Sequence, residues 1–201
     1  IGERSISSHK KHAVTDAPDQ WGSFCRLSAV VFGRSIMYLG LNTFIVLYFM
    51  NHFHESQNFS NLLLSVYYGI GALFTLSGGK LGDKHGYRAF VRFGFLLAFP
   101  AALILAWTDN SILGILCLIV LGAALNLTYS PMVVLGQQYL PNRVGLASGI
   151  TLGLAVSVGG ITAPLLGKVG DMYGLETTFY VIALITLIPL ISSFTLPKPK
   201  K

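Results

Sequence analysis

Six long apolar stretches, separated by short polar turns, limit what this chain can fold into. Each is close to the roughly 20 residues that an α-helix needs to cross a bilayer. In hydrocarbon every backbone amide must be paired within the protein, and the stretches do not alternate polar with apolar residues, so helices are favoured over a β-barrel. The sequence therefore predicts an all-α polytopic membrane protein with six transmembrane helices, at about 27–50, 62–78, 89–107, 112–135, 144–167 and 177–196.

The composition agrees with a membrane environment. Charged residues make up 11% of the 201 residues, whereas a soluble domain usually carries about 25%. Because so few charges cannot cover a globular surface, we expect lipid as the solvent. The net charge of +6 raises the question of nucleic acid, but the basic residues gather at the ends of apolar runs. We therefore expect the lipid bilayer, and no nucleic acid, as a partner.

The distribution of lysine and arginine predicts the orientation in the membrane. Six crossings place both ends of the chain on one side, which collects twelve basic residues, whereas the other side has only Lys168. This excess predicts cytoplasmic termini in a plasma (inner) membrane. Residues 1–20 are interpreted as a polar cytoplasmic linker or tail and 198–201 as a basic cytoplasmic tail. Because the chain begins with Ile rather than Met, we expect it to be a piece of a longer protein.

A polar turn occurs twice, as GKLGDKHG at 79–86 and as GKVGDMYG at 167–174. The shared glycines, Lys and Asp keep a constant spacing of 88 residues, and three predicted helices lie between the copies. The copies should therefore lie on opposite faces of the membrane. This pattern indicates two inverted three-helix repeats, which are common in secondary transporters. Loops between membrane helices favour Gly, Lys and Asp in any case, so an independent origin stays open.

The first turn, GKLGDKHGYR, resembles the loop signature of the major facilitator superfamily, which joins the second and third helices of each six-helix half. The run YLPNRVGLASGITLG at 139–153 is also similar to that family, most of all to the fosmidomycin-resistance group of drug exporters. The resemblance covers about residues 21–197. It implies a carboxy-terminal six-helix half whose partner is an amino-terminal half. It further implies alternating-access transport of a small-molecule substrate, as secondary active efflux of drug-like compounds or metabolites by an antiporter.

The resemblance also assigns a gating role to this turn. In the family the Asp of the loop latches the turn to a neighbouring helix and biases the alternation between states. Tyr87 stands where the family often has a second basic residue, which predicts a weaker charge network. A solvated turn whose charges only fix topology is the alternative. The gating candidates are Asp83, the glycines Gly79 and Gly86, and three basic residues on the same side that are placed to pair with Asp83, namely Lys84, Arg88 and Arg143.

A charge within an apolar stretch and two polar patches indicate a cavity. Arg34 lies about two turns into the first stretch, where a charge costs about 2.5–3.5 kcal/mol on insertion scales. Four-residue steps place it on one face with Tyr38 and Asn42. The alternative is an arginine that snorkels to the interface. A second patch surrounds Pro131, and the resemblance matches both stretches to cavity-lining helices. The substrate-cavity candidates are Arg34, Tyr38, Asn42, Asn126, Tyr129 and Ser130.

The fifth stretch carries small residues at four-residue spacing, Gly145, Gly149 and Gly153. Small residues so spaced let helix backbones approach closely. The face they form is expected either to slide against the missing half or to serve static packing.

The acidic residues and histidines all fall in tails, loops or helix ends. A proton relay within the membrane normally needs such a group, so the titrating carboxylate of a proton-coupled transporter would lie in the other half. No nucleophile–base pair or metal-ligand cluster is apparent, so we expect no enzyme, cofactor or metal. The remaining alternatives are a sugar or organic-anion carrier and a non-transporting membrane scaffold half.

Overall fold

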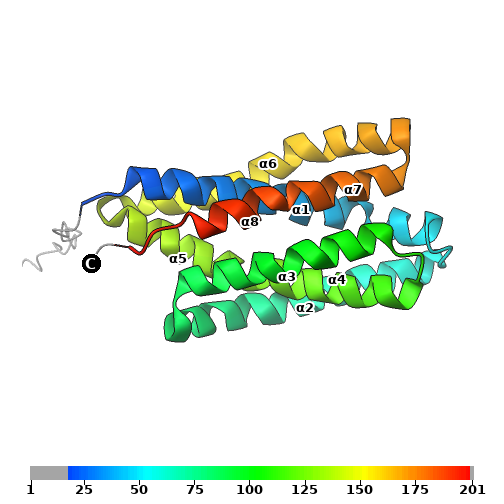
Figure 1. The fold of residues 1–201 in the computed structure, drawn as a ribbon, viewed down its shortest axis with the longest axis horizontal. Coiled ribbons are helices and arrows are strands. Elements are labelled where there is room, and N and C mark those ends of the chain that lie inside the picture. The colour runs from blue at the N-terminus through cyan, green and yellow to red at the C-terminus, as the bar shows by residue number, and fades with distance from the viewer. Residues whose placement is uncertain (1–17, 200–201) are drawn as a thin grey trace, which may run out of the picture.

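The computed structural model describes residues 18–199, which form helices and no strand. Residues 1–17 and 200–201, which include most of the two predicted tails, lie outside the described part. Six long apolar rods, each a single helix or two consecutive helices that together make one crossing, run lengthwise through one bundle (Figure 1). The described helices are α1 (Trp21–Asn51), α2 (Gln57–His85), α3 (Tyr87–Trp107), α4 (Ser111–Leu127), α5 (Tyr129–Tyr139), the 3-10 turn η1 (Pro141–Arg143), α6 (Val144–Tyr173), α7 (Leu175–Ile185) and α8 (Leu187–Phe194).

The rods are longer than the apolar stretches, and two of them are broken. The chain stays helical beyond the apolar residues until a cap ends it, so α2 continues to His85. The fourth and sixth crossings are interrupted at Thr128 and Thr186, each three residues before a proline. Pro131 and Pro189 have no N–H for the carbonyl four residues earlier. That carbonyl belongs to the last residue of α4 in one crossing and of α7 in the other.

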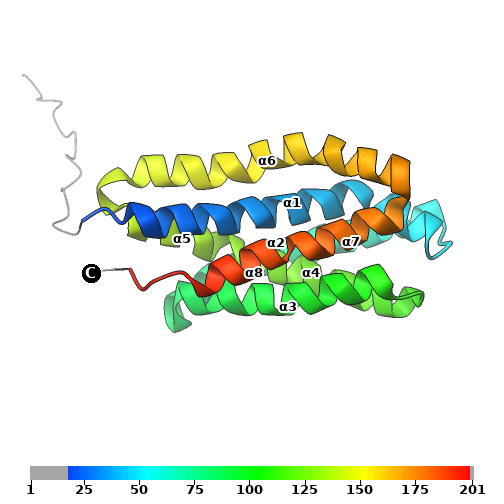
Figure 2. The same ribbon diagram turned by 45° about the horizontal axis from the view of Figure 1, so that its top comes forward.

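The order of the rods gives two inverted three-helix repeats. The α2–α3 turn lies at the end of the bundle that holds both ends of the described chain, and the α6–α7 turn lies at the opposite end (Figures 1 and 2). Gly86 and Gly174 occupy these turns with φ of 92° and 89°. The Gly86 N–H donates to Gly82 O over 2.8 Å and the Gly174 N–H to Gly170 O over 2.9 Å. The repeated sequence therefore encodes the same helix cap at both ends of the bundle.

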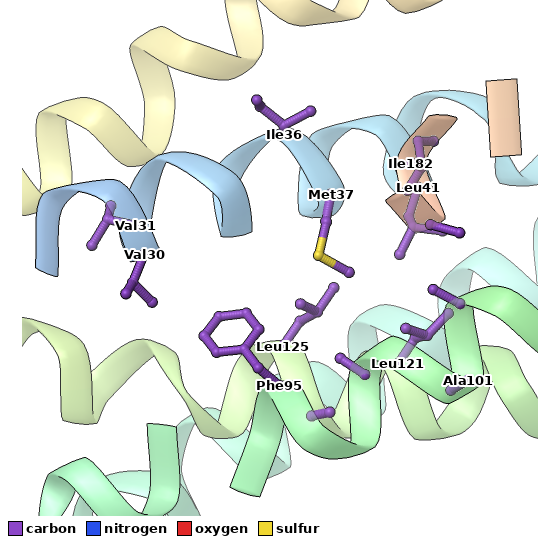
Figure 3. Close-up of a cluster of buried hydrophobic side chains, with 14 of the residues drawn as sticks. Val30, Val31, Ile36, Met37, Leu41, Phe95, Ala101, Leu121, Leu125 and Ile182 are labelled. Carbon is purple, nitrogen blue, oxygen red and sulfur yellow. The ribbon is translucent and has the colours of Figure 1, made fainter. Parts of the chain in front are cut away.

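The core gathers around α1. Figure 3 shows Met37 of α1 directed toward Leu121 and Leu125 of α4, with Phe95 of α3 beside them. In its most apolar window α1 has 61% of its residues buried, whereas α2 and the crossing that contains α6 each have 22%. Much of the apolar surface of α2 and α6 therefore faces outward from this bundle.

The predicted glycine stripe lies on this outward surface. Outside the helix itself, no atom of the described chain lies within 4 Å of a Cβ built at Gly145, Gly149 or Gly153. Static packing within the described bundle therefore does not use the stripe. The close approach of α6 to α1 occurs instead at Gly159, against which Leu39 packs.

The capping glycines give a direct test of the two turns. An L side chain in the left-handed region costs roughly 1–2 kcal/mol, so Gly86→Ala and Gly174→Ala should each lower the melting temperature of the full-length protein in detergent. Gly160→Ala is the matched control, because the position is helical and open. Equal melting temperatures for Gly174→Ala and Gly160→Ala would contradict the assigned cap.

Candidate functional site

A cavity of about 610 Å³ opens between α1, α2, the α4–α5 break and α6. Four of the six predicted cavity residues line it, and they come from the two helices on which the sequence placed them. The lining residues are Arg34 and Tyr38 of α1, Tyr68, Gly71, Ala72, Thr75 and Leu76 of α2, Asn126 and Tyr129 of the fourth crossing, and Ala155 and Val156 of α6.

Asn42 and Ser130 do not line this cavity. Each four-residue step along an α-helix turns a side chain by about 40°, so Asn42 lies well around α1 from Arg34. Its Oδ1 is buried and has no hydrogen-bond partner among the described residues. Ser130 follows Tyr129 and is turned by about 100°. Its Oγ lies 3.0 Å from the position of a Cβ built at Gly79, so it packs against α2.

Arg34 is buried inside the bundle and does not reach out to an interface. Only 4% of its surface is exposed. Its Nε donates to the Leu125 carbonyl over 2.9 Å. Its guanidinium carbon lies 5.1 Å from the Tyr38 ring centroid and 4.7 Å from that of Tyr129, both within cation–π range. No carboxylate of the described chain forms an ion pair with it.

The break in the fourth crossing explains why a carbonyl is available to Arg34. Leu125 lies in the last turn of α4, where carbonyl oxygens lack the partners that a continuing helix would supply. The Leu125 carbonyl also accepts the Thr128 hydroxyl over 2.9 Å. Helix α2 approaches the same break closely, since the Leu127 carbonyl packs against Gly78. The local sequence from Leu125 to Pro131 thus prepares an acceptor at the cavity wall.

The part of the cavity wall around Asn126 includes two residues that the sequence analysis did not identify, Gly71 and Thr75 of α2. Asn126 Nδ2 donates to Gly122 O over 2.8 Å, and Thr75 Oγ1 lies 3.5 Å from Asn126 Oδ1. A Cβ built at Gly71 would lie 2.7 Å from Asn126 Nδ2, so the missing side chain makes room for the amide. Gly71 and Thr75 stand one helical turn apart in α2. That spacing was the available signal, but small and hydroxyl side chains recur along the whole of α2 and single out no face.

The predicted gating residues are arranged differently from the expected charge network. Asp83 accepts a hydrogen bond from the Tyr87 hydroxyl across the turn. Arg143 pairs instead with Asp19, with Nε and Oδ2 3.4 Å apart. Neither Lys84 nor Arg88 forms an ion pair within the described part of the chain. The residue that departs from the family pattern, Tyr87, is therefore the partner of Asp83.

Comparisons with known proteins agree with this fold. Residues 27–201 match the family model of the Major Facilitator Superfamily. An uncharacterized MFS-type transporter of Bacillus subtilis (strain 168), YfnC, is 32% identical over 162 residues, which are 80% of this chain and 39% of that protein. The fosmidomycin resistance protein of Escherichia coli (strain K12) is 30% identical over 169 residues, which are 84% of this chain and 41% of that protein.

Solved transporter structures share the fold at lower identity. The peptide transporter POT in complex with alafosfalin superposes with a TM-score of 0.81 at 18% identity, over 97% of this chain and 43% of that one. FucP in the outward conformation gives a TM-score of 0.78 at 17% identity, over 88% of this chain and 42% of that one.

Six membrane-spanning helices in two inverted repeats make this an integral membrane protein with half of a transporter fold. The chain belongs to the major facilitator superfamily. It spans about two fifths of the length of the curated relatives it matches.

The Asp83–Tyr87 contact generates a testable prediction about the gating role that we propose for this turn. In the full-length protein, Tyr87→Phe and Asp83→Asn should each reduce the transport rate, by about tenfold for a hydrogen bond to a charged group, while membrane insertion stays unchanged. Tyr173→Phe is the control, because Tyr173 stands in the second turn and is exposed. Wild-type transport by Tyr87→Phe at equal expression would show that the contact does not bias the gate.

Proposed function

We propose that this chain is the carboxy-terminal half of a secondary transporter that exports small drug-like or metabolite molecules by alternating access. The observation that carries the proposal is the polar cavity built around Arg34. A cavity of this size with convergent polar groups is suited to a small molecule. The similarity to the fosmidomycin resistance protein supports efflux as the direction. An organic-anion carrier is the second candidate, and the charge of Arg34 favours it.

Arg34 supports a substrate that carries a negative charge. The guanidinium is buried, yet its contacts are a carbonyl oxygen and two aromatic rings, none of which carries a full negative charge. A buried cation is costly unless an anion compensates it. No Asp, Glu or His lines the cavity in the described residues. The substrate itself therefore supplies the missing negative charge in this half, and if transport is coupled to protons, the titrating carboxylate belongs to the other half.

The outward apolar surfaces of α2 and α6 support a partner half. The cavity borders on both helices, and both expose large apolar side chains next to it, such as Leu76 and Val156. An amino-terminal six-helix half covering this side would close the cavity from one end and then from the other as the halves rock. The glycine stripe of α6 lies on the same helix and would allow close approach during that motion. The excess of basic residues at the end of the bundle that holds both ends of the described chain supports a cytoplasmic location of that end.

Efflux from cells that express the full-length protein tests this function. Labelled organic anions should leave these cells faster than control cells, and Arg34→Gln should raise the KM for anions by about tenfold. The KM for neutral substrates should stay unchanged. Arg26→Gln is the matched control, since Arg26 lies on the same helix but is exposed and donates to the Thr195 carbonyl. A normally inserted protein that moves no compound in either direction would instead identify a scaffold half.

A further inference from the structure

A second hollow, of about 490 Å³, lies at the α2–α3 turn and shares no lining residue with the polar cavity. It is formed by the end of α2, the first turns of α3, the end of α5 and the residues after α8. Four of its lining residues are basic, His85, Arg88, Arg92 and Lys198, and no Asp or Glu lines it. Three of these residues, Arg88 and Arg92 of α3 and Lys198 after α8, carry a permanent positive charge, so two separate segments bring positive charge to this open hollow.

The walls of this hollow are held in place by hydrogen bonds that do not neutralise its charge. Arg92 donates through Nε to the Ser193 carbonyl over 3.1 Å and through Nη2 to the Phe194 carbonyl over 2.9 Å. The Tyr139 hydroxyl donates to the Pro197 carbonyl over 2.7 Å. These bonds fix the residues after α8 against α3 and α5, and they place Lys198 at the hollow. All three acceptors are neutral carbonyls, and neither Arg92 nor Lys198 forms an ion pair within the described residues.

Arg88 gives an independent sign of a missing ligand. Its Nε is buried and has no hydrogen-bond partner among the described residues, whereas buried polar groups in proteins nearly always have one. The nearest carboxylate in sequence, Asp83, does not line the hollow and accepts the Tyr87 hydroxyl. The start of α3 adds to the positive potential, because its first backbone N–H groups have no side-chain cap.

The surroundings of the hollow match the level of lipid headgroups. Directly beyond it, α3 exposes Phe93 and Leu96, and α8 exposes Phe194, each by more than half of its surface (54%, 55% and 54%). Exposed apolar side chains of this kind are suited to contact with acyl chains. The hollow lies at the end of the bundle that the charge distribution predicts to be cytoplasmic. Basic pockets on the cytoplasmic side of membrane helices are suited to anionic headgroups.

We propose that this hollow binds a phosphate group that carries a net negative charge, with Arg88, Arg92 and Lys198 as its ligands. The phosphate belongs either to the headgroup of an anionic phospholipid or to a free phosphate ion. Binding ties the start of α3 to the residues after α8, next to the α2–α3 turn. This site is separate from the substrate cavity and does not depend on the transported compound.

Binding of soluble short-chain lipids to the purified full-length protein in detergent tests the proposal. Short-chain phosphatidylglycerol should bind at least about tenfold more tightly than the zwitterionic phosphatidylcholine of equal chain length. Arg88→Gln and Lys198→Gln should each weaken phosphatidylglycerol binding by about tenfold. Lys84→Gln is the charge-matched control, because Lys84 is exposed at the same end of the bundle and does not line the hollow.

A third titration, with inorganic phosphate, separates the two sources of the group. If inorganic phosphate displaces phosphatidylglycerol, or binds alone with the same dependence on Arg88, the site also takes free phosphate. If inorganic phosphate does not bind, the site is assigned to lipid. Equal binding of the two lipids would overturn the proposal, as would equal losses from Arg88→Gln and Lys84→Gln. Lys198→Gln keeps the test decisive if Arg88→Gln does not fold, since Lys198 is exposed beyond the last helix.

Discussion

The contact between the Arg34 guanidinium and the Leu125 carbonyl organises the polar centre of this bundle. It exists because α4 ends at Leu127, so that Leu125 lies in a last helical turn whose carbonyl oxygens lack the partners of a continuing helix. A neutral acceptor fixes the position of the arginine but leaves its charge free, and two tyrosine rings hold the guanidinium plane at the cavity. An Asp or Glu at the position of that carbonyl would have tied the charge internally. The carbonyl instead leaves a positioned cation for a ligand.

The two ends of the bundle are each marked by one copy of the polar turn. The two copies of the polar turn cap α2 and α6 with the same glycine geometry at opposite ends of the bundle. They differ in what surrounds the cap. The first copy has the Asp83–Tyr87 contact and the basic hollow beside it, whereas beside the second Glu176 Oε1 lies 2.9 Å from His52 Nδ1. The two ends therefore share the cap and differ in the polar groups around it.

The helices and turns are well predicted from the sequence, because each depends on residues that are close together in the chain. The length of the apolar stretches predicts the membrane crossings, and the repeated glycines predict the turns. The fold class and the family stated from the sequence are confirmed by the comparisons. The cavity was less predictable, because periodicity identifies a helix face but not its neighbours. Arg34 was conspicuous as a lone charge. Thr75 was not conspicuous, because its place in the cavity wall depends on Asn126 of another helix. The Asp19–Arg143 pair was missed because it joins two segments that sequence spacing does not relate.

We propose that Arg34 makes the cavity a site for anions, and the rate of thiol labelling at the cavity wall tests this proposal most directly. A full-length protein with Val156→Cys, in a background of Cys25→Ser and Cys117→Ala, carries a single reporter thiol of this chain at the cavity wall. An anionic methanethiosulfonate should label it faster than a cationic one of similar size, and Arg34→Gln should abolish that preference. A preference that is absent with Arg34 in place, or that survives its replacement, would contradict the account.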